Sequence, residues 1–215
     1  RELYHQSMAV RRRHGDKRKI ASLLSNLGII AWFRNDLAEA RRLYEESLTI
    51  RRELGDRWSI ANSLNNLALL LGDLGEITAA RGLLEECLAI NRELGDRWAV
   101  SNSLSSLGDV TLDQGDYPAA RRYLREGTVI SRELGDRVAI AFSLEQFAEL
   151  AVGEGDPPLA FRLAAAAAAL REAIQSQAPP NQQQRLKKWL DRVATTLSPA
   201  DIRERVEWAI GRVDG

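Results

Sequence analysis

The sequence predicts an all-α fold in which antiparallel helix pairs stack into an α-solenoid. The first observation is a Gly-Asp dipeptide that recurs every 40 residues, at Gly15, Gly55, Gly95 and Gly135. The second is that columns of leucine and of small residues keep the same register. The third is the helical spacing of the apolar residues inside each repeat. A fixed period of this size is typical of stacked supersecondary units, each of which buries its apolar face against its neighbours.

Three columns of residues define the expected core of this array. One holds leucine, one holds alanine, and one holds a small residue of varying type. Small side chains at fixed positions let two helix backbones approach closely. The members are Leu24, Leu64, Leu104 and Leu144; Ala40, Ala80, Ala120 and Ala160; and Ser47, Cys87, Gly127 and Ala167.

Each repeat contains two helices. In the first, Ile60, Leu64, Leu67 and Leu71 recur at the spacing of one helix face. A short turn and a second apolar helical pattern follow. Glycine at the Gly-Asp step suits the left-handed residue after a helix, and aspartate suits the N-cap of the next helix. Because the connections are this short, neighbouring helices are expected to run antiparallel.

These columns resemble the tetratricopeptide repeat, which has Leu-Gly or Leu-Ala in its first helix and small residues in its second. The usual period of that family is ~34 residues, so the repeats here correspond to a variant with longer helices. That variant is similar to the repeats of kinesin light chains and of G-protein-signalling modulators. The resemblance implies a right-handed superhelix whose first helices line a concave groove, and a function in protein–protein interaction.

The repeat register divides the chain into an array and a C-terminal segment. Residues 1–16 align with residues 41–56, so the array is expected to open on the second helix of a truncated repeat and to be a fragment of a longer protein or array. We expect a half unit at 1–14 and full units at 15–54, 55–94, 95–134 and 135–176. Residues 177–215 are expected to form a linker and two capping helices, and they are similar to the C-terminal end of bacterial signalling ATPases and transcriptional regulators.

Composition excludes several classes of function. Thirty basic residues balance thirty acidic residues, so a strongly electrostatic partner such as nucleic acid is not indicated. No apolar run approaches the ~20 residues that a membrane helix needs. Cys87, His5 and His14 have no metal-site spacing, and no cofactor is expected. We expect a cytoplasmic protein.

No motif in the sequence indicates catalysis. A Gly-rich phosphate loop followed by Lys-Ser/Thr is absent, as are an HExxH zinc motif and a Cys/His nucleophile pair in a recognisable context. Most carboxylates occupy positions that face solvent in the helical pattern. The sequence therefore predicts a non-catalytic protein.

A polar stripe on the first helix of each repeat is the candidate binding surface. At 100° per residue, Asn62, Asn65, Asn66, Leu69 and Asp73 cluster opposite the core face of their helix. The resemblance places this stripe in the concave groove, where amides could bind a peptide backbone. The full candidate set is Asn26, Ile29, Phe33, Asn62, Asn65, Asn66, Leu69, Asp73, Asn102, Ser106, Asp109, Asp113, Glu145, Gln146 and Glu149.

Two interpretations of this stripe stay open. In one, it binds a peptide or a partner domain as the sensor part of a larger bacterial signalling protein. In the other, the amides are merely solvated, and the array is a scaffold or self-associates through its truncated first repeat. The stripe itself carries no Lys or Arg, so C-terminal carboxylate ligands are not expected. Trp58 and Trp98 share one column and are expected to stack on the preceding helix or to lie at the groove edge.

Overall fold

The computed structural model describes residues 17–179 and 182–188, and these ranges contain helices joined by short turns. The expected half unit at 1–14 and most of the expected capping helices lie outside the described residues. Helices begin at the same two points of every repeat, 40 residues apart. Their bounds are α2 (Lys17–Phe33), α3 (Leu37–Leu54), α4 (Arg57–Asp73), α5 (Ile77–Leu94), α6 (Arg97–Asp113), α7 (Tyr117–Leu134), α8 (Arg137–Gly153) and α9 (Pro157–Ala173). A short helix at 182–188 follows.

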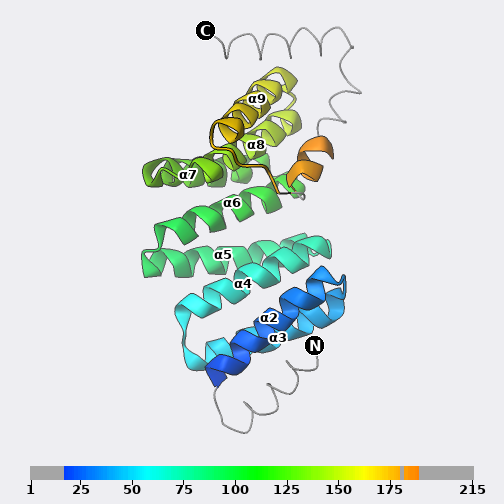
Figure 1. Cartoon of the computed structure of the whole chain (residues 1–215), viewed down its shortest axis with the longest axis vertical. Coiled ribbons are helices and arrows are strands. Elements are labelled where there is room, and N and C mark those ends of the chain that lie inside the picture. Colours follow the sequence, from blue (N-terminus) through cyan, green and yellow to red (C-terminus); the bar gives the residue numbers. More distant parts are fainter. Residues whose placement is uncertain (1–16, 180–181, 189–215) are drawn as a thin grey trace. The chain divides into compact units, whose positions relative to one another are not determined.

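The chain forms two compact units that meet within α6, after Ser103. In the N-terminal unit, α2 packs against α3 and α4 against α5, and α3 also contacts α4. In the C-terminal unit, α8 packs against α9 and α7 contacts α8. Figure 1 shows the paired helices side by side within each unit. The prediction of an all-α fold built from helix pairs is confirmed.

Each unit is held together by the columns that the sequence identifies. Leu24, Leu64 and Leu104 are fully buried, as are the alanines of the second column. In the third column, the Ser47 hydroxyl donates to the Ala21 carbonyl at 2.8 Å, and the Cys87 thiol donates to the Ala61 carbonyl at 3.3 Å. A larger side chain at these positions would separate the helices and break this contact.

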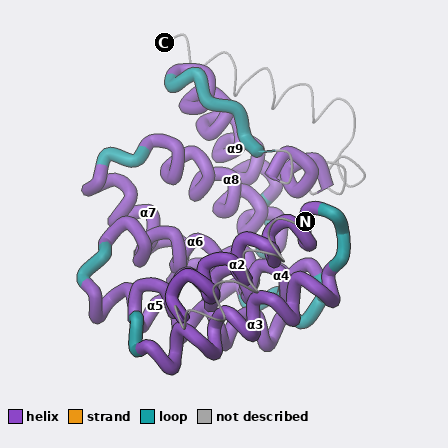
Figure 2. The backbone as a smooth tube through the Cα atoms, turned by 60° about the horizontal axis from the view of Figure 1, so that its bottom comes forward, coloured by secondary structure: helices purple, strands orange, loops and turns teal. Residues whose placement is uncertain are grey.

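Capping residues explain where the helices begin and end. The Asp56 carboxylate accepts from the Ser59 backbone N–H at 3.2 Å, and aspartates at equivalent positions cap other helices in the same way. Gly55 closes α3 with φ of 66°, a left-handed value that glycine adopts without strain. The turns that result are short and lie at the helix ends (Figure 2). The Gly-Asp period in the sequence is therefore the period of the turns.

The tryptophan column differs from its main expectation. Trp58 and Trp98 expose 59% and 60% of their surface, so neither is buried by stacking on the preceding helix. Both residues lie in the first turn of their helix, where few neighbouring side chains reach them. The structure leaves two large aromatic side chains in contact with solvent in the N-terminal unit.

Candidate partner-binding site

The amide stripe of the N-terminal unit faces away from the core. Asn26 and Asn62 are exposed, and Asn65, Asn66 and Asn102 are half-buried. Within the described residues, none of these five side-chain amides has a hydrogen-bond partner in the protein. Each amide can both donate and accept, so the stripe presents hydrogen-bonding groups that no other protein group occupies.

Apolar side chains flank the amides of this stripe. Phe33 at the end of α2 exposes 88% of its surface and Leu69 in α4 exposes 41%, while Ile29 is half-buried. Trp32 lies on the same part of α2, and its indole N–H donates to the Asp73 carboxylate at 2.7 Å. That bond ties α2 to α4. Asp73 is therefore already engaged, whereas Phe33 and Leu69 are open to contact.

The same stripe in the C-terminal unit is largely closed by its own hydrogen bonds. Gln146 was expected at the accessible surface, but it is 2% exposed. Its amide donates to the Ser105 carbonyl at 2.8 Å and to the Asp109 carboxylate at 2.9 Å, and it accepts from the Ser105 hydroxyl at 2.9 Å. The glutamine side chain is long enough to reach α6, where its amide makes these hydrogen bonds. Ser106, next to Ser105, remains half-buried.

Glu145 is a second residue whose predicted exposure is wrong. It is 9% exposed and forms a bidentate ion pair with Arg171 of α9, at 2.6 and 3.0 Å. Arg171 is itself 8% exposed, and its guanidinium also donates to Gln182 at 3.0 Å. A buried carboxylate needs such a partner because its desolvation is costly. Glu145 therefore holds the structure together and is not free to contact a partner.

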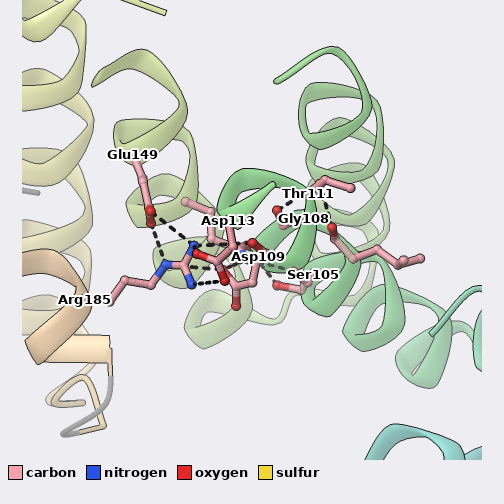
Figure 3. A network of polar contacts seen from close by, with 9 residues as sticks. Ser105, Gly108, Asp109, Thr111, Asp113, Glu149 and Arg185 are labelled. Carbon is pink, nitrogen blue, oxygen red and sulfur yellow. Dashed lines mark hydrogen bonds and ion pairs between the residues drawn. The ribbon is translucent and has the colours of Figure 1, made fainter. Parts of the chain in front are cut away.

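The remaining acidic residues of the stripe converge on Arg185 from the helix at 182–188. Its guanidinium lies 2.5 Å from Glu149, 3.1 Å from Asp113 and 3.8 Å from Asp109, and it donates to the Asp109 carbonyl at 3.4 Å. Figure 3 shows the arginine reaching from one side into these carboxylates. The expectation that no basic side chain lies on this surface is wrong for the C-terminal unit.

Charge and burial shift the ionisation of this cluster. Burial raises the pKa of Asp109 to about 6, although Arg185 and the hydrogen bond from Gln146 both act to lower it. Burial acts to lower the pKa of Arg185, but Asp109, Glu149 and Asp113 outweigh that effect, so its pKa is raised. Arg185 is therefore held in its charged form by the carboxylates around it.

Reasoning from the sequence did not identify Arg171 and Arg185, the two arginines that pair with the acidic residues of this stripe. Arg171 lies in an alanine-rich helix and Arg185 lies beyond the proline break, outside the repeat. Spacing offers one signal, because Arg185 stands 40 residues after Glu145 and so continues the register of the stripe. Opposite charges at positions that would become neighbours in a stacked array could have indicated the contact.

The described part of the chain has neither a metal-ligand cluster nor a membrane-spanning helix. No group of three or more His, Cys, Asp or Glu side chains there could hold a metal ion. Among the same residues, none of the helices is long and apolar enough to cross a bilayer. Cys87, in the core of the N-terminal unit, is buried, and burial raises the pKa of its thiol, as expected of an inert thiol.

Stacked helix pairs with a polar stripe on the first helix of each pair define an α-solenoid repeat protein. The family model described as tetratricopeptide repeat matches residues 1–53 and 59–133, more than half of the chain. The chain belongs to the tetratricopeptide repeat family, whose members generally mediate protein–protein interactions.

Solved structures show the same fold. BtubC (BKLC) from P. vanneervenii is 20% identical, with a TM-score of 0.73 over 83% of this chain and 74% of that chain. A Podosopora anserina protein described as a kinesin light chain, with nearly identical TPR-like repeats, is 18% identical, with a TM-score of 0.67 over 82% of this chain and 87% of that one. The expected similarity to kinesin light chain repeats is confirmed at the level of the fold. A search of curated proteins gives no match.

Proposed function

We propose that the N-terminal unit binds an extended peptide along its amide stripe. The observation that carries the proposal is that the amides of Asn26, Asn62, Asn65, Asn66 and Asn102 have no partner within the described protein. In the C-terminal unit, Ser105, Glu145 and Gln146 occupy positions that correspond to Asn65 and Asn66, and they are hydrogen-bonded or ion-paired instead. Polar groups left open in one unit and satisfied in the other support a role in recognition.

The chemistry of the stripe fits a peptide backbone. An asparagine amide can accept from a backbone N–H and donate to a backbone carbonyl. Each such bond contributes about 1 kcal/mol net, so the amides alone give weak binding. Phe33 and Leu69 supply the exposed apolar surface that a ligand side chain could cover, with a gain of roughly 25 cal/mol per Å².

The test uses peptides selected for binding to the full chain from a random display library. We expect the triple variant Asn62→Ala, Asn66→Ala and Asn102→Ala to bind the selected peptides roughly 100-fold more weakly, because about three bonds of about 1 kcal/mol are lost. Isothermal titration calorimetry measures the affinity and circular dichroism checks that helicity is retained.

Exposed residues of another face provide the control. Glu85→Gln with Glu86→Gln changes exposed side chains of α5 and is expected to leave peptide affinity unchanged. Unaltered affinity in the asparagine triple variant would remove the stripe from the site. A sensing role in a larger bacterial signalling protein rests on the similarity of the C-terminal end and stays a prediction.

A scaffold function is the second candidate, and the exposed tryptophans favour it. Trp58 and Trp98 leave more than half of their surface in solvent, and such aromatic surface is common where proteins associate. Under this alternative the chain self-associates, and Trp58→Ser with Trp98→Ser returns it to a monomer. Sedimentation equilibrium measures the mass of both proteins, and a wild-type chain that is strictly monomeric contradicts the scaffold function.

A further inference from the structure

The helix at 182–188 covers the part of the stripe that belongs to the C-terminal unit. We propose that this helix is a displaceable intramolecular occupant, and that the surface beneath it binds peptides that present an arginine next to an apolar residue. The inference rests on the proposed function, because it treats the stripe as a peptide-binding surface, but it concerns the other unit and a different ligand chemistry.

The charges around Arg185 are the first argument. Asp109, Asp113 and Glu149 surround this one guanidinium, so the carboxylates outnumber the cation even when the helix is in place. Fork-shaped guanidinium groups match carboxylates with two parallel hydrogen bonds, as Arg185 does with Glu149 at 2.5 and 3.1 Å. The surface is thus built to hold an arginine side chain, and the chain's own arginine currently fills it.

A buried hydrogen-bond donor beside the helix is the second argument. Arg171 is more than nine-tenths buried, yet its Nη1 has no hydrogen-bond partner. The other terminal nitrogen of the same guanidinium is shared between Glu145 and Gln182 of the covering helix. A buried donor left unsatisfied is costly. The resident helix therefore leaves the Nη1 donor of Arg171 without an acceptor, and a ligand carbonyl near Arg171 could accept from it.

The way the helix is held is the third argument. Its apolar contact with the core of the unit is made by Leu186, which packs as a partly buried side chain against the cluster of Ala148, Ala151 and Ala160. Gln182 and Arg185 add polar contacts to Arg171 and to the carboxylates of α6 and α8. A space of about 10 Å³ lies between the helix and α8. A segment held mainly by charge can leave without opening the apolar core.

The chemistry of the resident helix indicates the ligand. Arg185 fills the carboxylate cluster, Leu186 lies against the apolar cluster, and Gln182 meets Arg171. A competing peptide would therefore carry Arg followed by an apolar residue, with a side-chain or backbone carbonyl one helical turn earlier. Basic peptides of this kind would displace the helix, and acidic peptides would not.

The first measurement asks whether the ion cluster holds the helix in the full chain. Amide hydrogen exchange of residues 182–188 is compared among wild type, Arg185→Glu and the charge swap Arg185→Glu with Glu149→Arg. We expect at least tenfold faster exchange in Arg185→Glu and recovery in the swap. Lys188→Glu makes the same charge change on an exposed residue of the same helix and is expected to exchange like wild type.

The second measurement asks whether the uncovered surface accepts a peptide. The probe is a fluorescent synthetic peptide with the sequence of residues 177–188, and its binding to the full chain is followed by polarisation. We expect it to bind Arg185→Glu at least tenfold more tightly than wild type, because the tethered helix no longer competes. A peptide in which the arginine is replaced by glutamate is expected to bind neither protein.

Three results would overturn the proposal. They are unchanged exchange in Arg185→Glu, equal peptide affinity for wild type and Arg185→Glu, and equal binding of the arginine and glutamate peptides. None of these depends on Asn62, Asn66 or Asn102, so failure here leaves the test of the N-terminal unit intact.

Discussion

Gly28 of α2 packs directly against the Tyr44 ring of α3. A Cβ atom placed on Gly28 would lie 2.6 Å from Cε1 of the Tyr44 ring, which is itself 1% exposed. At the equivalent positions of the next repeat the sequence has Ala68 and Leu84. The larger ring in one repeat is therefore matched by the smaller residue opposite it.

Gly28→Ala is expected to lower the free energy of unfolding by about 1 kcal/mol. The overpacking cost of about 1–3 kcal/mol exceeds the gain of about 1 kcal/mol from replacing a glycine within a helix. The double variant with Tyr44→Leu recreates the pair found in the next repeat and should recover part of this loss. Urea denaturation of the two single variants and the double variant measures the coupling, and additive effects would show that the two positions do not clash.

Asp109 should make stability depend on pH in an unusual direction. Its pKa in the folded protein is raised from 3.8 to about 6, chiefly by burial. The folded state therefore binds a proton more tightly than the unfolded state does, so the stabilisation from this proton is present at low pH and lost as the pH rises through about 6. Glu149 and Asp113 add to the rise in the pKa of this carboxyl, whereas Arg185 and the hydrogen bond from Gln146 oppose it.

Asp109→Asn cannot ionise and isolates this effect. The free energy of unfolding of the wild type, relative to Asp109→Asn, is expected to fall as the pH rises from about 4 to about 6. Chemical denaturation at several pH values measures the difference, and the carboxyl carbon resonance of Asp109 reports its pKa directly. A carboxyl that titrates near its ordinary value would show that it is solvated and not desolvated by its neighbours.

Among the helices from α3 to α9, α5 is the one that begins without a side-chain cap hydrogen bond. Glu76 occupies its N-cap position but makes no side-chain cap hydrogen bond, whereas Asp56, Asp116 and Asp136 cap their helices. The glutamate is one methylene too long, and its carboxylate pairs instead with Arg41 at 2.6 Å. Such exposed ion pairs contribute roughly 0–1 kcal/mol.

Glu76→Asp is therefore expected to raise the free energy of unfolding by roughly 0.5 kcal/mol, because an aspartate cap contributes about 1 kcal/mol and the lost ion pair less. Thermal unfolding followed by circular dichroism measures the change. Glu76→Gln removes the charge without adding a cap and serves as the matched comparison. If Glu76→Asp is no more stable than Glu76→Gln, the cap has not formed.

The helices could be predicted from the sequence because residues close in the chain determine where each helix begins and ends. Glycine at a left-handed residue and aspartate at an N-cap act through bonds to residues a few positions away, so a 40-residue spacing of Gly-Asp gives the spacing of the helices. The buried leucine and alanine columns follow from the helical period for the same reason. Asn35, with φ of 60°, replaces the glycine found in the later turns. The glycine pattern therefore does not reveal this first turn.

The candidate site could be predicted only where no distant residue intervenes. Asn62 and Asn26 face solvent because the helical period alone places them there. The helical period places Glu145 and Gln146 on the same face, but both are buried. Arg171 pairs with Glu145, and Ser105 accepts from Gln146. A polar residue is read as exposed from its pattern, and only the folded chain shows the charged or polar partner that allows it to be buried.

The two units present their stripes in different states. Among the described residues, the five stripe asparagines of the N-terminal unit have no hydrogen-bond partner for their amides, and the C-terminal unit pairs Glu145 and Glu149 with Arg171 and Arg185. One repeat architecture thus carries an open surface and an occupied one. This difference predicts that the N-terminal unit binds a peptide without displacing a resident segment and that the C-terminal unit responds to basic ligands.

The most direct test of this account is an NMR titration of the ¹⁵N-labelled full chain with a peptide selected for binding. We expect the side-chain amide resonances of Asn62, Asn66 and Asn102 to shift with the same saturation curve as the peptide signal. The backbone amide resonances of Glu85 and Glu86, which are exposed on α5, should stay in place. Shifts confined to those two α5 residues, with the asparagine amides unmoved, would contradict the claim that the amide stripe is the binding site.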